Sequence, residues 1–215
     1  MKLRHLAAAL LAALILSGVH GSKETRWTAP RLFPGTLLEA TYTPTPIQSL
    51  QSGMIDLASA TSNTATITSV NTSSAALIFL GNRNNNNTTS ANQWLCRVAL
   101  TNATTVTATR GASQAGAQEC GFTVLEYLPQ FIKSVQAGTI SLTSVTTNTA
   151  TITSVNTAKA YVAYLGVDTG DTNSPTTPDI SMARVSLQSA TSVLAAHYAG
   201  SAFTFNVGYQ VVEFK

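Results

Sequence analysis

A ten-residue segment that occurs twice is the feature of this chain that most constrains its fold. Asn63–Thr72 reads NTATITSVNT, and Asn148–Thr157 repeats the same letters 85 positions later. The match continues outward at this offset and, after the following loop, at an offset of 87. Self-similarity over such a period is the signature of a duplicated structural unit. The sequence therefore predicts two tandem copies of one domain, over residues 47–129 and 130–215.

Each copy alternates polar and apolar residues in the manner of short β-strands. In residues 203–211 of the second copy every other residue is apolar, which predicts a half-buried strand. Only 10% of the residues are charged, against about 25% in a typical soluble domain, and Thr, Ser, Asn and Ala take their place. Thr favours strands because it is β-branched. We expect an all-β chain of two β-sandwich repeats, jelly-roll or Ig-like, with about six strands each. In the first copy we expect strands near Leu50–Leu57, Asn63–Val70, Ala75–Leu80, Trp94–Leu100, Thr104–Arg110 and Cys120–Tyr127.

Residues 1–21 have the layout of a secretory signal peptide. Lys2 and Arg4 precede the apolar run Leu6–Leu16, and small residues follow it. The alternative interpretation is a short hydrophobic helix that is retained and buried in an assembly or a membrane. Residues 22–46 contain four prolines without a clear period, which predicts an extended arm.

The net charge of +3 does not indicate a nucleic-acid partner. The excess of basic residues lies before residue 47, and residues 47–215 hold seven basic and seven acidic side chains. Nucleic-acid binding needs clustered Lys and Arg with interleaved aromatic residues, and neither copy has such a cluster. We expect no nucleic-acid partner, and a membrane contact only through residues 1–21 if they are retained.

The sequence shows no motif for catalysis, a cofactor or a metal. His197 is the only histidine after residue 21, and its counterpart in the first copy is Arg110. We therefore expect this position to carry an outward-facing polar side chain. P-loop, GxGxxG, HExxH and nucleophile-elbow patterns are missing from the sequence. The interpretation is a non-enzymatic protein without a cofactor or metal, although Asp168, Asp171, Asn173 and Asp179 offer oxygen ligands of the kind that calcium prefers.

Two pairs of residues are candidates for structural bonds. Cys96 and Cys120 lie in strand-like stretches of the first copy, and they predict either a disulfide or two buried thiols, depending on export to an oxidising compartment. Arg97 and Glu126, with their counterparts Arg184 and Glu213, are the charges kept at equivalent places in both copies. We expect each Arg–Glu pair to form a cross-strand ion pair that fixes the register.

The loops of different length between the matched segments are candidates for contact surfaces. The first reads GNRNNNNTTSANQ and the second VDTGDTNSPTTPD, and both occupy the same place in their copies. Binding residues often lie on such loops. We expect contacts with a glycan or a partner subunit through Arg83, Asn84, Asn85, Asn86, Asp168, Asp171 and Asn173.

The run SGMIDLASATSNTATITSVNT, with RVALTNATTVTATR and FTVLEY after it, resembles repeats of bacteriophage virion proteins, in tail fibres and capsid decorations. The second copy, with AGTISLTSVTTNTATITSVNT, ARVSLQSATSVLAAHY and VGYQVVEFK, resembles the same pattern, so the resemblance covers residues 47–215. It implies a structural or receptor-contacting protein with no catalytic residues to transfer. The signal-like segment departs from the pattern, because most virion proteins assemble in the cytoplasm.

The sequence therefore leads to one expectation and two alternatives. We expect a virion structural protein, a fibre, spike or capsid-decoration subunit, that assembles with itself or other virion subunits and contacts the host surface. The first alternative is a secreted or surface-displayed bacterial adhesin or glycan-binding module. The second is a small hydrolase on a β-sandwich, which would depend on Asp168 or His197.

Overall fold

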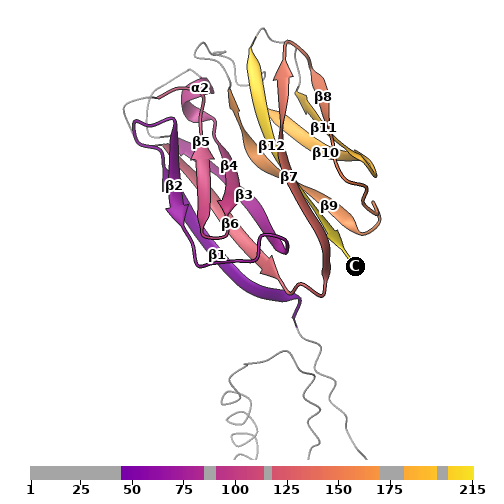
Figure 1. Ribbon diagram of the computed structural model, residues 1–215. Helices are drawn as coiled ribbons and strands as arrows, with labels where there is room; N and C mark the ends of the chain where they lie inside the picture. Colours follow the sequence, from indigo (N-terminus) through magenta and orange to yellow (C-terminus); the bar gives the residue numbers. More distant parts are fainter. Residues whose placement is uncertain (1–44, 85–90, 114–117, 170–181, 198–202) are drawn as a thin grey trace, which may run out of the picture. The chain divides into compact units, whose positions relative to one another are not determined.

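Antiparallel strands make up most of the described chain (Figure 1). The computed structural model describes residues 45–84, 91–113, 118–169, 182–197 and 203–215. The hydrophobic segment 1–21 and nearly all of the arm 22–46 therefore lie outside the described residues. Thr45–Lys215 forms one compact unit. In the part of the chain that is described, no helix is long and apolar enough to cross a membrane.

The first half forms two three-stranded arrays around one core. One array has the order β1-β6-β3, with bounds Ile47–Asp56, Gln118–Tyr127 and Ala75–Asn84. The other has the order β2-β5-β4, with bounds Ser62–Thr66, Thr105–Thr109 and Arg97–Asn102. Alternate residues of both arrays point inward and are buried, among them Ile55, Leu77, Val98, Val106 and Phe122. This burial of one face per strand is what the period-two pattern predicts.

The second half repeats this pairing strand for strand. One array has the order β7-β12-β9, with bounds Ile132–Thr143, Thr204–Phe214 and Ala160–Thr169. The other has the order β8-β11-β10, with bounds Thr147–Thr151, Ser192–His197 and Ala183–Ser189. The predicted all-β class is confirmed. We interpret the shared order, at the offsets of 85 and 87 residues, as two copies of one six-stranded unit.

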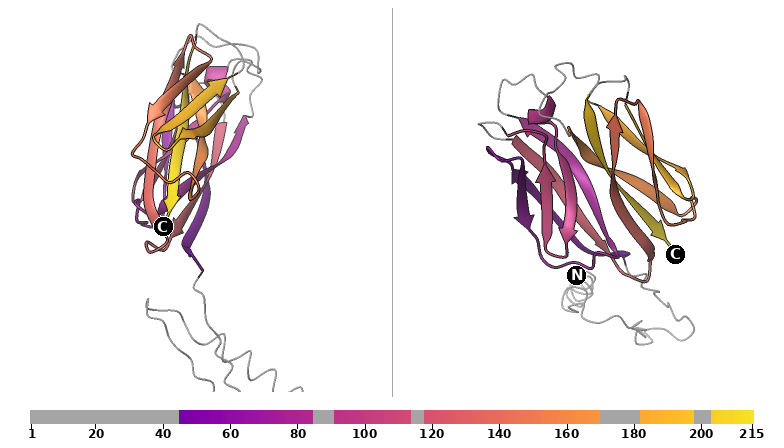
Figure 2. Two further views of the ribbon diagram at one scale, coloured as in Figure 1. Left: turned by 90° about the vertical axis from the view of Figure 1, so that its right-hand side faces the viewer. Right: turned by 45° about the horizontal axis from the view of Figure 1, so that its top comes forward.

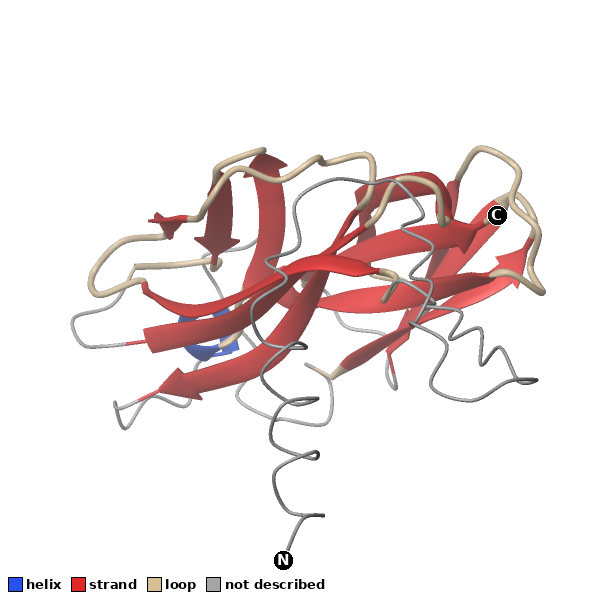
Figure 3. Cartoon of the chain, turned by 90° about the horizontal axis from the view of Figure 1, so that it is seen from below, coloured by secondary structure: helices blue, strands red, loops and turns tan. Residues whose placement is uncertain are grey.

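One short helix, α2 (Ala91–Trp94), interrupts the strands of the described chain (Figure 3). It follows β3 in the sequence and precedes β4. Ala91 and the following Leu95 are buried in the core of the second half, whose other members come from β7 to β12 and the loops between them. The connection between two strands of the first half thus supplies apolar surface to the second half.

The two halves lie side by side, as both Figure 1 and the right view of Figure 2 show. Arg97 of β4 pairs with Gly166 of β9, and this bridge joins the strands into a six-stranded sheet of order β2-β5-β4-β9-β12-β7. A separate apolar cluster, centred on Ala76, Ile132 and Val212, also draws on both halves. The halves are therefore packed against each other, and not merely connected in sequence.

The strands give the described chain two distinct ends. At one end lie the paired residues Ile47–Tyr127 and Ile132–Phe214. At the other lie Asn84–Gln118 and Thr169–Phe205. The strand ends that flank residues 85–90, 114–117, 170–181 and 198–202 all belong to this second end (Figure 1). Both variable loops of the sequence therefore start from the end opposite to the one where the chain enters β1.

Candidate functional site

The twice-occurring segment uses its polar side chains to hold neighbouring backbone. Asn63 donates from Nδ2 to the Asp56 carbonyl at 2.7 Å, and Asn148 donates to the Ser141 carbonyl at 2.8 Å. The backbone N–H of Thr68 donates to the side-chain carbonyl of Gln51 at 2.7 Å. Gln136 and Thr153 form the same pair at 2.7 Å in the second half. The two segments therefore make the same local bonds in both halves.

Glu126 and its counterpart Glu213 bind the twice-occurring segment, and neither forms the ion pair with arginine that the sequence predicts. Glu126 accepts hydrogen bonds from the Asn71 backbone N–H at 2.8 Å and from Ser49 Oγ at 2.9 Å. Glu213 accepts the equivalent bonds from Asn156 and Ser134 at 2.7 and 3.2 Å. Both glutamates are buried in the described structure, and these donors satisfy carboxylate oxygens that have little access to water.

Glu213 has one additional partner, Lys133, whose Nζ lies 2.9 Å from its Oε1. This hydrogen bond is the largest cause that lowers the pKa of the Glu213 carboxyl below its ordinary value, and the bond from Asn156 adds to it. The carboxylate is thus held in its charged form in the folded protein.

The predicted Arg–Glu ion pairs are wrong. Arg97 lies at the start of β4, at the loop end, whereas Glu126 lies near the last residue of β6, at the opposite end of the other array. Arg97 instead donates from Nε to Asp168 Oδ2 at 2.9 Å. Arg184, its counterpart on β10, is exposed and makes no ion pair with the described residues. The sequence alignment of the two copies identified equivalent positions but not which positions meet across sheets.

Asp168 is a junction residue and not part of a contact loop, which corrects its predicted role. It belongs to β9 and is 5% exposed. Besides Arg97, it accepts a hydrogen bond from Thr109 Oγ1 at 3.0 Å and one from Asn206 Nδ2 at 2.9 Å. Its partners on β4 and β5 belong to the first half. The carboxylate therefore binds the two halves together, and it is saturated by protein donors.

Of the other predicted contact residues, two lie within the described structure. Arg83 of β3 forms an exposed ion pair with Glu119 of the neighbouring β6 at 2.9 Å. This pair raises the pKa of the Arg83 guanidinium through the hydrogen bond to Glu119. Asn84 is the last residue of β3 and is partly exposed. Asn85, Asn86, Asp171 and Asn173 lie outside the described residues, as does Asp179.

The prediction that His197 and Arg110 face outward is also wrong. Arg110 is 4% exposed and donates from Nε to the Ala60 carbonyl at 2.9 Å. His197 is 8% exposed, and its Nε2 lies 2.8 Å from the carbonyl of Val145, the residue equivalent to Ala60. Both side chains thus close the turn after the first strand of their unit. Two different residues serve there because each places a ring or guanidinium nitrogen at the equivalent carbonyl, and Arg110 also donates to the Ala58 carbonyl.

Cys96 and Cys120 form a disulfide with a Cα–Cα distance of 6.5 Å, which settles the open choice between a bond and free thiols. Cys96 precedes β4 and Cys120 lies in β6, so the bond connects the two arrays of the first half. Ala183 and Val207 occupy the equivalent places in the second half. Among the described residues no group of three or more His, Cys, Asp or Glu side chains could hold a metal ion.

Gln210 of β12 is a junction residue that the sequence did not single out. Its side-chain carbonyl accepts a hydrogen bond from the Leu77 backbone N–H at 2.7 Å, and its amide donates to the Ala75 carbonyl at 3.3 Å. The side chain therefore pairs with the edge of β3 as a strand would. Thr123 stands at the equivalent place in the first half. This difference between the copies is the signal that could have indicated a junction role.

Gly166 is the second junction residue of this kind. Its backbone has a positive φ of 91°, and a Cβ there would lie 2.3 Å from the Cys96 carbonyl oxygen. Only glycine allows β4 to approach β9 so closely. The equivalent Gly81 also has a positive φ, of 103°, but a Cβ there would meet nothing within 4 Å. The two glycines share a backbone shape, and only one of them has a strand packed on it.

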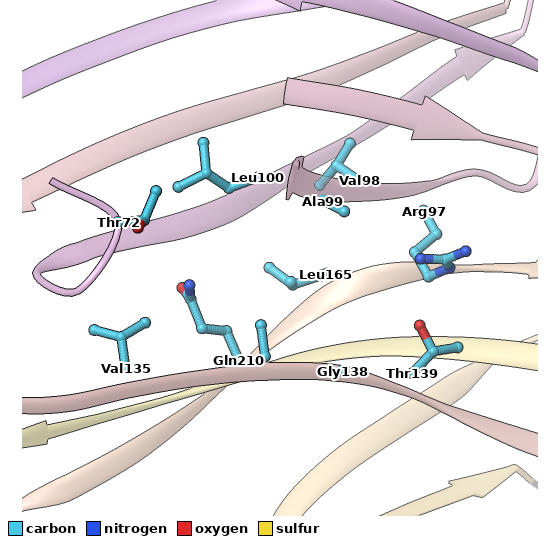
Figure 4. Close-up of a pocket in the computed structure, with 11 residues that line it drawn as sticks. Thr72, Arg97, Val98, Ala99, Leu100, Val135, Gly138, Thr139, Leu165 and Gln210 are labelled. Atoms are coloured by element: carbon cyan, nitrogen blue, oxygen red, sulfur yellow. The ribbon is translucent and has the colours of Figure 1, made fainter. Parts of the chain in front are cut away.

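A cavity of about 320 Å³ lies beside this junction (Figure 4). Its walls come from Arg97–Leu100 of β4 and from Val135 and Ala137–Thr139 of β7, with Leu165 and Gln210 between them. The lining is mainly apolar and carries one charged side chain, Arg97, which is already bound to Asp168. The arrangement has the character of a junction between two packed units and offers no acid, base or nucleophile pair.

The fold and these bonds define an all-β protein whose two similar halves are fixed together by buried polar contacts. Comparison with protein-family models, with curated proteins and with solved structures found no match.

Proposed function

We propose that the chain is a non-enzymatic virion structural protein, a fibre, spike or capsid-decoration subunit that projects β-domains for assembly and contact with the host surface. The observation that carries this proposal is that the chain entry and the variable loops belong to opposite ends of the described unit. The chain enters at the Ile47 end, and the strand ends that flank both variable loops lie at the opposite end. A subunit attached through its N-terminal side would present these loops outward.

The junction supports the same role. Arg97–Asp168, Gln210 and the bridge at Gly166 fix the halves through side-chain and backbone bonds that are largely buried. A projecting element benefits from such stiffness, because a flexible connection between its units would not hold the outer loops at a defined distance. The resemblance of residues 47–215 to repeats of tail fibres and capsid decorations agrees with this role.

The test compares purified particles with culture supernatant from cells that encode the chain. Mass spectrometry should find the protein in the particle fraction, in a fixed ratio to the major capsid protein. Intact-mass measurement then determines whether residues 1–21 are present. A protein found only in the supernatant and free of particles would contradict the virion proposal.

A secreted or surface-displayed adhesin is the second candidate, and the disulfide favours it. Disulfides persist in oxidising compartments and are rare in the cytosol, where most virion proteins assemble. In this case the mature chain lacks residues 1–21 and appears at the cell surface or in the medium. Binding to a glycan array, lost when the loop-end residues Arg83 and Asn84 are changed, would identify this function.

A further inference from the structure

The outer face of the β1-β6-β3 array carries four exposed apolar side chains. Leu50 and Met54 of β1 and Ile78 and Leu80 of β3 are exposed, and we call these four residues the outer patch. The register places them in neighbouring rows of one face, since Leu50 lies opposite Leu125, and Ile78 and Ser52 both lie opposite Thr123. Monomeric proteins rarely leave contiguous apolar patches of this kind without a partner.

The equivalent face of the second half shows what covers such a patch. Leu165, the counterpart of Leu80, is 3% exposed where Leu80 is 60% exposed. Leu165 belongs to the core of the first half, so it is buried by the other copy of the unit. On the central strand, Gln210 and Val212 of this face are also buried. The second half therefore has a neighbouring unit on this face. In the first half Ala76 and Leu125 pack against the second half, and the outer patch beyond them stays exposed.

The element that covers the second half is β4, which lies over Gly166 and Gly208 through Arg97. The counterpart of β4 in the second half is β10, whose Arg184 is exposed. Met182, just before β10, is 66% exposed, whereas its counterpart Leu95 is buried in the core of the second half. In the described unit the outer patch is thus exposed. The strand β10, which is the counterpart of β4, covers no neighbouring unit within the described residues.

We propose that a second copy of this chain docks its β10 edge on the outer patch, in the way that β4 docks on β9 and β12 within the chain. Gly81 leaves the space that a docking strand needs, as Gly166 does in the occupied junction. Glu119 stands at the place of Asn206, beside the outer patch, and offers a carboxylate to Arg184. Arg83 stands at the place that Asp168 has in the second half, and it already pairs with Glu119. In the proposed contact Glu119 is therefore shared between Arg83 and the incoming Arg184.

The proposed contact is heterologous, because the patch and the strand are different surfaces of one molecule. Such contacts leave one free patch and one free strand at the ends of every open assembly, so they produce filaments, or rings where the rotation between subunits closes. This inference rests on the proposed structural role for its biological meaning. Its physical test does not, since self-association can be measured whether or not the chain is found in particles.

The first experiment is analytical ultracentrifugation of the purified protein over a range of concentrations. We expect species larger than a dimer to grow as the concentration rises. Leu80→Asp would place an unpaired carboxylate in the contact and should weaken association at least about a hundredfold. Val145→Asp, which changes an exposed apolar side chain after β7, should associate like the unchanged protein. Met54→Asp gives a second test of the patch if Leu80→Asp proves unstable.

The second experiment mixes two variants, each of which retains one of the two surfaces. Leu80→Asp keeps β10 intact, and Arg184→Glu keeps the outer patch intact. Each should be largely monomeric alone, and their mixture should form one-to-one dimers that grow no further. A protein that stays monomeric at every concentration, or Arg184→Glu chains that still dimerise through the patch alone, would overturn the proposal. The first result would mean that a copy of this chain is not the partner of the patch.

Discussion

Arg97 Nε lies 2.9 Å from Asp168 Oδ2, and this ion pair joins a strand of the first half to a strand of the second. The carboxylate is almost fully buried, and the guanidinium side chain is 20% exposed. Thr109 and Asn206 complete the hydrogen bonds of the carboxylate. The pair is therefore well satisfied, and removal of either charge leaves the other without its partner.

Asp168→Ala should lower the free energy of unfolding by about 3 kcal/mol, because it leaves a partly buried guanidinium unpaired. Chemical denaturation followed by circular dichroism measures this change. Arg83→Ala is the control, since it breaks the exposed pair with Glu119, and it should change stability far less. Equal effects of the two variants would show that the junction pair contributes no more than a surface pair.

Gly166→Ala should destabilise the protein considerably more than Gly81→Ala. Both substitutions place a Cβ on a residue with positive φ, which costs about 1 kcal/mol. At Gly166 the new Cβ also meets the Cys96 carbonyl oxygen, whereas at Gly81 it meets open space. The difference between the two melting temperatures isolates the strand contact. Similar melting temperatures would argue against close packing of β4 on β9.

Gln210→Ala should cost about 2 kcal/mol, because the buried Leu77 N–H loses its acceptor. Gln51→Ala removes the same type of amide pairing, with Thr68, at an exposed place where water can replace it. It should therefore cost less. Hydrogen exchange provides a direct readout, since the Leu77 amide should exchange faster in the Gln210 variant. An unchanged exchange rate at Leu77 would contradict the proposed pairing.

Reduction of the Cys96–Cys120 disulfide should destabilise the first half. The cysteines are 24 residues apart in sequence, and loop closure over this distance contributes about 3 kcal/mol. The Cys96→Ala, Cys120→Ala double variant should match the reduced protein in denaturant titrations and should not respond to reductant. A double variant as stable as the oxidised protein would show that packing alone holds these strands.

The stability of the protein should fall in acid through Glu213. Its pKa is lowered in the folded state, so its contribution is complete above the unfolded value of about 4.3. It is lost as the pH falls below that value and through the lower folded pKa. Glu213→Gln should therefore be less stable than the unchanged protein at neutral pH and should lose less stability below pH 4. Melting temperatures across this range test the prediction, with Glu119→Gln as a control for a carboxylate that is only partly buried.

The all-β class and most strand positions were accessible from the sequence, because alternation and turn residues are local signals. Phe205 and Val207, for example, alternate with polar or small neighbours and are buried in the structure. The equivalence of Glu126 and Glu213 was also visible, and both carboxylates do have the same structural partners. Local pattern and internal comparison are therefore sufficient for elements and for positions within one unit.

Contacts between sheets and between halves were not accessible in this way. Arg97 was paired with Glu126 by analogy, although Asp168 satisfies it from the other half. His197 was expected to face outward because Arg110 stands at the equivalent place, yet both are buried against carbonyls. In each case the partner is a distant backbone or strand, and its position depends on packing that no local pattern encodes.

The order of strands has a consequence for the way the chain reaches its folded state. In each half the central strand of one array, β6 or β12, is the last to appear in the sequence. Neither array can close until that strand has left the ribosome, and its pairings span most of the unit, which slows folding. The first half can be completed once Tyr127 has emerged, whereas the second must wait for Phe214. During synthesis the finished first half would therefore expose the surfaces of β3 and β4 that later pack against its neighbour, and the nascent second half is the segment closest at hand to occupy them.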